Sequence, residues 1–374
     1  MKLSRTAALT AMAAGLTMMI SSTANAGMFL HRGFLAGGGA GAIARHGTLM
    51  QTAGGQGFLR RRGAVGANGA FNHRITGAMS NGAGTGAAGT AHRFAGPNGA
   101  NGSAGTFFKR NADGSASAAH NRNVNGANGG NYSANSSGQR YADGSATGTV
   151  NKSSSNGGSV NKNYNRDASG NATYTANKVG ANGGSSTKDY NKTASGTTYN
   201  SDRTGPNGAS ATHDLTKSAN GNTYTVQKTG VNGSTVDKSY TYGNGTHSQD
   251  VTRTGVNGST ETTSGSGTGG AGNYTSNRTT TYSGVNGANG SRTVGTAAAA
   301  GSSYNRSVNG SGTNAAGNPY TRTSSTNAAY GSGFNSSANV GGVNGTTASG
   351  SVSGSQATGV SGSGSVTPPP APQQ

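Results

Sequence analysis

The central part of the chain alternates between larger and small polar residues at every second position. In residues 222–229, Tyr224, Val226 and Lys228 occupy one set of alternate positions, and Thr223, Thr225 and Gln227 occupy the other. A period of two is the signature of a β-strand, and Thr, Tyr and Val are strand-forming residues. Val236, Lys238, Tyr240 and Tyr242 share one face of a second such segment. We therefore expect short strands in this part of the chain.

An Asn-Gly step punctuates these segments, usually within Gly-x-Asn-Gly. Its Asn residues are 68, 98, 128, 156, 182, 207, 232, 257, 286, 309 and 344. Asn-Gly suits both central positions of a two-residue type I′ turn, because Asn tolerates and Gly favours positive φ. A second turn signal, such as Ala219-Asn220-Gly221, lies between successive steps. The turn residues with a 25-residue period are Asn182, Gly183, Asn207, Gly208, Asn232, Gly233, Asn257 and Gly258.

Each 25-residue unit is therefore expected to contain two short strands and two tight turns. Such units are stable only beside neighbours, since one hairpin alone is marginal in water. Two architectures fit this pattern, a β-solenoid with one unit per coil and an array of hairpins. Stacked units would superpose Tyr174, Tyr199 and Tyr224, which we expect to carry the packing between repeats.

Basic residues keep the same phase as the repeat. They are Lys152, Lys178, Arg203, Lys228 and Arg253. Stacked units would place these cations about 4.8 Å apart, where like charges repel unless water or an anion intervenes. The column therefore either binds a polyanion or opposes tight stacking. We also expect Arg60, Arg61 and Arg62 to bind polyanions.

Composition sets a limit on this fold. Leu, Ile, Val and Phe make up only about 10% of the 374 residues, and 69 residues are Gly. That share is well below the roughly 20% under which a chain struggles to build a core. A conventional globular enzyme is excluded. We expect a low-complexity all-β repeat in the centre with largely disordered N- and C-terminal regions. The alternative is disorder throughout.

Four regions follow from these patterns. Residues 1–26 resemble a secretory signal peptide, with basic Lys2 and Arg5, an uncharged apolar stretch and Ala24-Asn25-Ala26 as the cleavage site. Residues 27–112 form a basic region rich in Gly, Phe, His and Arg without acidic residues. Residues 113–330 contain the repeats, and 331–374 form an uncharged Gly/Ser tail with a Pro-rich end.

Charge and export indicate the class of partner. The formal net charge is +19, and removal of Lys2 and Arg5 leaves +17. Such a balance favours acidic polysaccharide, lipopolysaccharide or another polyanion. Self-assembly is a further expectation, because strand edges and Asn-rich segments favour intermolecular β-pairing. No disulfides compensate for the thin core, because the chain has no Cys.

Catalytic and metal-binding patterns are missing. Gly265 to Gly270 match G-x-G-x-x-G, but no apolar strand precedes them and no helical pattern follows. Asp113 and Asp143 are better interpreted as turn residues than as calcium ligands, because other carboxylates are not close in sequence. No His pair has the spacing of a metal site. We expect no enzymatic activity, no cofactor and no small-molecule substrate.

The sequence therefore predicts an exported, non-enzymatic structural repeat protein of the bacterial cell surface or extracellular matrix. It would self-assemble and hold acidic polymers. The alternative is a disordered cationic protein that binds polyanions or membrane surfaces through residues 27–112. We expect it outside the cell or at its surface, with the periplasm left open.

Overall fold

The structure is a computed structural model that describes residues 28–38, 41–52, 55–66, 69–270, 272–342, 345–355 and 357–368. Its elements are all β-strands, which confirms the all-β prediction. The chain divides into two units, 1–182 and 183–374, and we describe each by itself. The predicted signal peptide, residues 1–26, lies outside the described residues.

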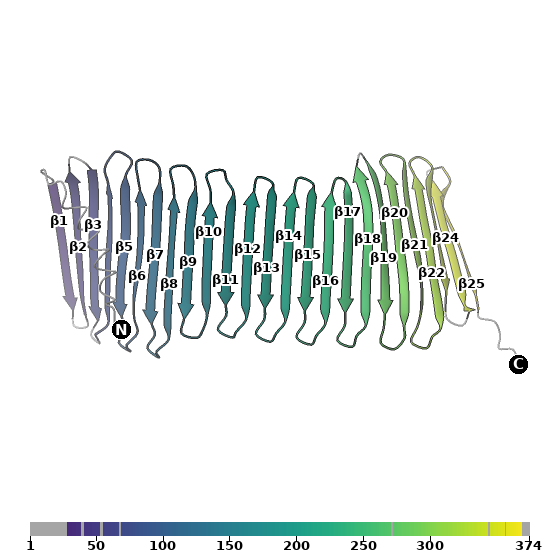
Figure 1. The fold of residues 1–374 in the computed structure, drawn as a ribbon, viewed down its shortest axis with the longest axis horizontal. Coiled ribbons are helices and arrows are strands. Elements are labelled where there is room, and N and C mark those ends of the chain that lie inside the picture. The colour runs from purple at the N-terminus through teal and green to yellow at the C-terminus, as the bar shows by residue number, and fades with distance from the viewer. Residues whose placement is uncertain are drawn as a thin grey trace. The chain divides into compact units, whose positions relative to one another are not determined.

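The described residues of unit 1 form eleven strands. They are β1 (Met28–Gly38), β2 (Gly41–Thr52), β3 (Gly55–Gly66), β4 (Phe71–Ser80), β5 (Gly86–Ala95), β6 (Asn101–Arg110), β7 (Ala116–Asn125), β8 (Asn131–Arg140), β9 (Ala146–Ser154), β10 (Ser159–Arg166) and β11 (Ala172–Val179). From β1 to β11, consecutive strands pair antiparallel (Figure 1). Consecutive strands thus form antiparallel hairpins.

In unit 2, the described residues form fourteen strands that are also paired in chain order. They are β12 (Ser185–Thr193), β13 (Gly196–Thr204), β14 (Ser210–Ser218), β15 (Gly221–Thr229), β16 (Thr235–Gly243), β17 (Thr246–Thr254), β18 (Thr260–Gly270), β19 (Asn273–Ser283), β20 (Asn289–Ala299), β21 (Ser303–Thr313), β22 (Pro319–Ala329), β23 (Gly333–Gly341), β24 (Thr347–Ser355) and β25 (Gly359–Thr367). Again each pairs antiparallel with its successor.

The 25-residue period is the length of one hairpin and its two turns. β13 and β14 have nine residues each, and the loops that follow them have five and two residues. Where the strands have ten residues and both loops have five, as in β6 and β7, the Asn-Gly spacing is 30. In a β-solenoid with one unit per coil, each strand would pair with the equivalent strand of the next repeat. The described pairings join consecutive strands instead.

The described Asn-Gly loops of the repeat, from Asn98 to Asn286, do not have the predicted type I′ geometry, and Asn68 and Asn344 lie outside the described residues. In the loop between β13 and β14, the Gly208 amide donates to the Gly205 carbonyl at 3.1 Å, and the Gly205 amide donates to the Ala209 carbonyl at 2.6 Å. Only the glycine has positive φ, 83° at Gly208. Because Gly205 and Ala209 are paired, the loop proper has three residues, 206–208, which form a type I turn followed by a left-handed residue. Pro206 is the first residue of this loop and the second residue of the turn, a position that favours Pro.

Other Asn-Gly steps behave differently from the repeat. Among the described residues, Asn244 is the one non-glycine with positive φ, 50°, and with Gly245 it forms the two-residue connection between β16 and β17. Asn309 and Gly310 lie in the middle of β21 and are not a turn. The loop that keeps the repeat there is 314–318, in which Gly317 has a φ of 80° and follows Ala316.

The terminal regions differ from the expectation of disorder. Strands β2 to β6 lie within residues 27–112, and β23 to β25 lie within 331–374. Strand pairing satisfies backbone N–H and C=O groups without large side chains, so a chain poor in apolar residues still forms ladders. Hydroxyl pairs add to this between β24 and β25, where Ser349 meets Ser365 at 2.7 Å and Ser351 meets Ser363 at 3.0 Å.

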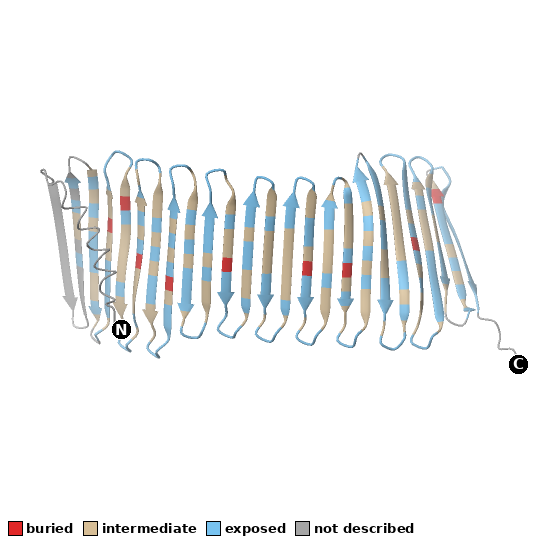
Figure 2. Ribbon diagram, viewed as in Figure 1, coloured by how far each residue is buried: buried red, intermediate tan, exposed pale blue. Residues whose placement is uncertain are grey.

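Little of either sheet is buried. Six hydrophobic residues among those described are buried, each at an isolated place along the strands (Figure 2), and no polar residue is: Ala87, Ala134, Ala176, Val226, Val251 and Val308. The close contacts within each unit join consecutive strands, so each described sheet is a single layer. Both faces of each sheet therefore meet solvent.

Candidate polyanion-binding face

The register of unit 1 places basic residues from separate strands in one row. The row runs from β2 to β11 through Arg45, Arg62, Arg74, His92, Ala104, Arg122, Ala134, Lys152, Val160 and Lys178. Residues directly opposite each other in an antiparallel pair project from the same face. We call this side of the unit 1 sheet its basic face.

Unit 2 has a corresponding row near the Asn-Gly loops. Arg203, Ala211, Lys228, Val236 and Arg253 lie side by side on β13 to β17. We call the side of the unit 2 sheet that carries this row its basic face. All three cations are exposed.

The spacing of these cations differs from the stacked arrangement. A small or apolar residue separates successive cations of the repeat, such as Ala211 between Arg203 and Lys228. Cations on alternate strands are about 10 Å apart, which is twice the strand spacing. At that distance two charges in water repel by only about 0.4 kcal/mol. The sheet therefore tolerates the five repeat cations without a bound anion, whereas Arg45, Arg62 and Arg74 lie on consecutive strands about 5 Å apart.

The arginine triplet is divided between the two faces of β3. Arg62 is in the basic row, and Arg60 projects from the same face opposite Thr76. Arg61 lies opposite Ile75 and projects from the other side. The structure therefore brings two of the three predicted residues to the basic face.

One acidic residue on the basic face was not singled out from the sequence. Glu261 of β18 lies opposite Arg253 and accepts a hydrogen bond from its Nη1 at 2.6 Å. Both side chains are over 40% exposed, so this pair contributes less than about 1 kcal/mol. No other ion pair joins the described residues. The repeat spacing could have indicated its place in the row, because Glu261 follows Asn257 by four residues, as Val236 follows Asn232.

An aromatic row runs through the middle of the basic face. In unit 1, Tyr164 lies opposite Tyr174. Unit 2 has its own aromatic row on five strands, which are represented by Tyr190, Tyr199, Leu215, Tyr224 and Tyr240. The rings of Tyr224 and Tyr240 are stacked with centroids 6.2 Å apart. Tyr199 and Tyr224 thus share a row, but their direct neighbours are residues of the intervening strands.

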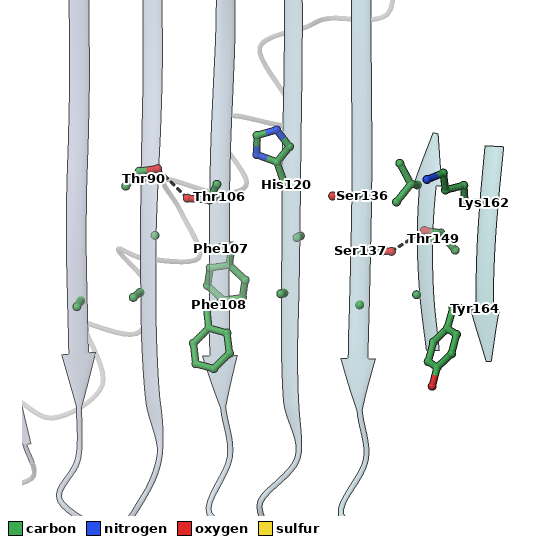
Figure 3. A pocket seen from close by; sticks show the side chains of 18 of the residues that line it. Thr90, Thr106, Phe107, Phe108, His120, Ser136, Ser137, Thr149, Lys162 and Tyr164 are labelled. Carbon is green, nitrogen blue, oxygen red and sulfur yellow. Dashed lines mark hydrogen bonds between the residues drawn. The ribbon is translucent and has the colours of Figure 1, made fainter. Parts of the chain in front are cut away.

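A shallow hollow of about 700 Å³ opens on the basic face of unit 1. One wall is a row of hydroxyl and basic residues that includes Thr90, Thr106 and His120 (Figure 3). The other is a row in which Ala and Gly lie between Phe108 and Tyr164. Thr90 and Thr106 share a hydroxyl hydrogen bond of 2.7 Å. The hollow joins apolar rings to hydroxyl groups beside the basic row.

The isolated aspartates close their own loops. Asp113 accepts hydrogen bonds from the amide and the hydroxyl of Ser115 at 2.9 and 2.7 Å, and Asp143 does the same with Ser145. The serine hydroxyl, followed by its amide, lowers the pKa of each carboxyl. Both residues are turn residues, and the described part of the chain brings no three His, Cys, Asp or Glu together as a metal site.

No protein-family model and no curated protein matches this chain. Among the described residues, no helix has the length and apolar character needed to cross a membrane.

Proposed function

We propose that this chain is a non-enzymatic structural protein whose basic face holds an acidic polysaccharide. The observation that carries the proposal is the alignment of exposed cations in one row of each sheet. In unit 1 the row includes Lys152 and Lys178, and in unit 2 it includes Arg203, Lys228 and Arg253. An extended polyanion can lie across the strands and meet a cation on every second one.

The rest of the basic face favours a sugar polymer among the polyanions. Tyrosine rings offer flat apolar surfaces with a polar edge, which suits the mixed character of a sugar ring. The hollow beside the unit 1 row adds the Thr90 and Thr106 hydroxyls to Phe108. These groups are donors, acceptors and apolar contacts for a ring that carries hydroxyl groups.

The proposed location is the bacterial cell surface or extracellular matrix. The support is the basic, apolar and small-residue order of residues 1–26. Acidic polymers are surface and matrix components, so export would bring the basic face to its partner. The β-sheets would then serve as extended supports for that polymer.

Salt-dependent binding to polygalacturonate tests the proposal. A variant with Lys152→Gln, Lys178→Gln and Lys228→Gln removes three cations from the basic face. We expect the slope of log K against log salt to fall by about two to three, since each ionic contact contributes nearly one unit. A fluorescence-anisotropy titration of the full chain at several salt concentrations measures it.

The control removes the same charge from the other side of the unit 1 sheet. Arg61, Arg93 and Lys109 all project from the face opposite the basic row. Their replacement by Gln should leave the slope nearly unchanged. Equal loss of slope in both variants would show binding by net charge alone and would overturn the assignment to the basic face.

A further inference from the structure

Charge is divided between the two faces of unit 2. All eleven of its Lys and Arg residues project from the basic face, where Glu261 is the one acid. The other side carries Thr, Ser, Asn and five Asp residues without a Lys or Arg, and we call it the hydroxyl face. The formal charges of the two faces are therefore +10 and −5.

The five aspartates form one patch. They are Asp189, Asp214 and Asp250 at the middle of β12, β14 and β17, and Asp202 and Asp237, two residues from an end of β13 and β16. Their partners are uncharged: the Thr212 hydroxyl donates to Asp202 at 2.7 Å, and the Thr225 hydroxyl donates to Asp214 at 3.2 Å. Four of the five are exposed, and Asp214 is half-buried. These hydroxyl groups thus orient the carboxylates of Asp202 and Asp214, and no Lys or Arg of the hydroxyl face neutralises the patch.

We propose that copies of this chain stack face to face, with the basic face of unit 2 of one copy on the hydroxyl face of unit 2 of the next. Pairing of identical faces would bring cations against cations or aspartates against aspartates. The unlike pairing brings opposite charges together. Because it uses two different surfaces, each added copy leaves one surface of each kind free, and the assembly grows without closing.

The size of the surface is sufficient for a stable contact. Strands of nine residues are about 30 Å long, and the six strands β12 to β17 span about 25 Å. Stacking over this patch would bury about 1,500 Å² in total, within the usual range of specific interfaces. Sheets pack about 10 Å apart, a gap that Lys and Arg side chains can fill with their alkyl stems.

This inference stands apart from the proposed function, although both use the basic face. Polysaccharide and a second copy would compete for the same cations. Loss of the aspartates should remove stacking and leave polymer binding, whereas loss of the basic-face cations should weaken both. The two proposals can therefore fail separately.

Sedimentation velocity of the full chain over a range of concentrations tests the stacking. One variant carries Asp202→Asn, Asp214→Asn and Asp237→Asn on the hydroxyl face. Its matched control carries Asp113→Asn, Asp143→Asn and Asp167→Asn in the loops of unit 1. Both variants gain the same net charge. Asn keeps the size of Asp and its capacity to accept a hydrogen bond, and far-ultraviolet circular dichroism checks that the strands persist.

We expect the wild-type chain to form a concentration-dependent series of species. The hydroxyl-face variant should lower the association constant by about tenfold or more, and the loop variant should change it by less than about twofold. A wild-type chain that stays monomeric would overturn the proposal. So would equal weakening by the two variants, or a hydroxyl-face variant that associates like the wild type.

Discussion

At the scale of single residues, the repeat depends on a glycine in a left-handed conformation at the third position of each loop. Gly208, Gly233 and Gly258 have φ angles of 83°, 84° and 83°. In two of these loops the preceding Asn accepts hydrogen bonds from the serine after the glycine: Asn232 from the Ser234 hydroxyl at 3.1 Å, and Asn257 from the Ser259 amide and hydroxyl at 3.2 and 2.9 Å. The Asn thus closes the loop with its side chain, while its backbone keeps negative φ.

Replacement of Gly233 by Ala should destabilise unit 2 by about 1–2 kcal/mol, because the left-handed conformation brings Cβ against the backbone. Chemical unfolding monitored by circular dichroism measures the change. Gly270→Ala is the control, since this glycine lacks positive φ and has open space around its α-carbon. Similar losses at both positions would contradict the role of the left-handed glycine.

The position of most turns was predictable from the sequence, but their type was not. Asn-Gly marks a type I′ turn and also the last two positions of a three-residue loop. The dipeptide alone does not distinguish the two, because the choice depends on the strand register on both sides. Asn309-Gly310 shows the further limit: strand pairing on both sides holds this step extended within β21.

At the scale of strands and loops, the period-two pattern predicted which residues share a face. Tyr224, Val226 and Lys228 lie on the basic face, as their spacing indicated. The pattern did not show the partner of each strand. For that reason the cation spacing of about 10 Å came only from the antiparallel register, in which Val236 lies between Lys228 and Arg253.

Acid should loosen the loops closed by aspartate. Hydrogen bonds from Ser115 and Ser145 hold the pKa of Asp113 and Asp143 below the ordinary value of 3.8. A lowered folded-state pKa means that the stabilisation is fully present above the unfolded-state pKa and is lost as pH falls through the folded-state pKa. Amide hydrogen exchange at Ser115 and Ser145, corrected for its intrinsic pH dependence, should therefore become faster below about pH 3.8.

The loop between β13 and β14 is an internal control for that measurement. Its Asn207 does not titrate, so corrected exchange in residues 205–209 should keep the same protection over this range. Parallel loss of protection in all three loops would mean that acid unfolds the sheets as a whole and would remove the local assignment.

At the scale of the whole molecule, the low share of large apolar residues fits the single-layer sheets, because neither provides a hydrophobic core. The sequence predicted that no substantial core would form, and the described residues bury six small or medium hydrophobic side chains. Backbone pairing from strand to strand supplies the order that a core would otherwise give. The sequence could not show that the terminal regions also pair, because Gly/Ser segments have the same composition in disordered chains.

Side-chain footprinting of the dilute chain with and without polygalacturonate tests most directly whether the basic face holds the polymer. Lysine acetylation reports on Lys188, Lys228 and Lys238 of the basic face, and carbodiimide labelling reports on Asp202 and Asp237 of the hydroxyl face. The polymer should protect the lysines and leave the aspartates as reactive as before. Equal protection of both faces, or of neither, would contradict the proposal.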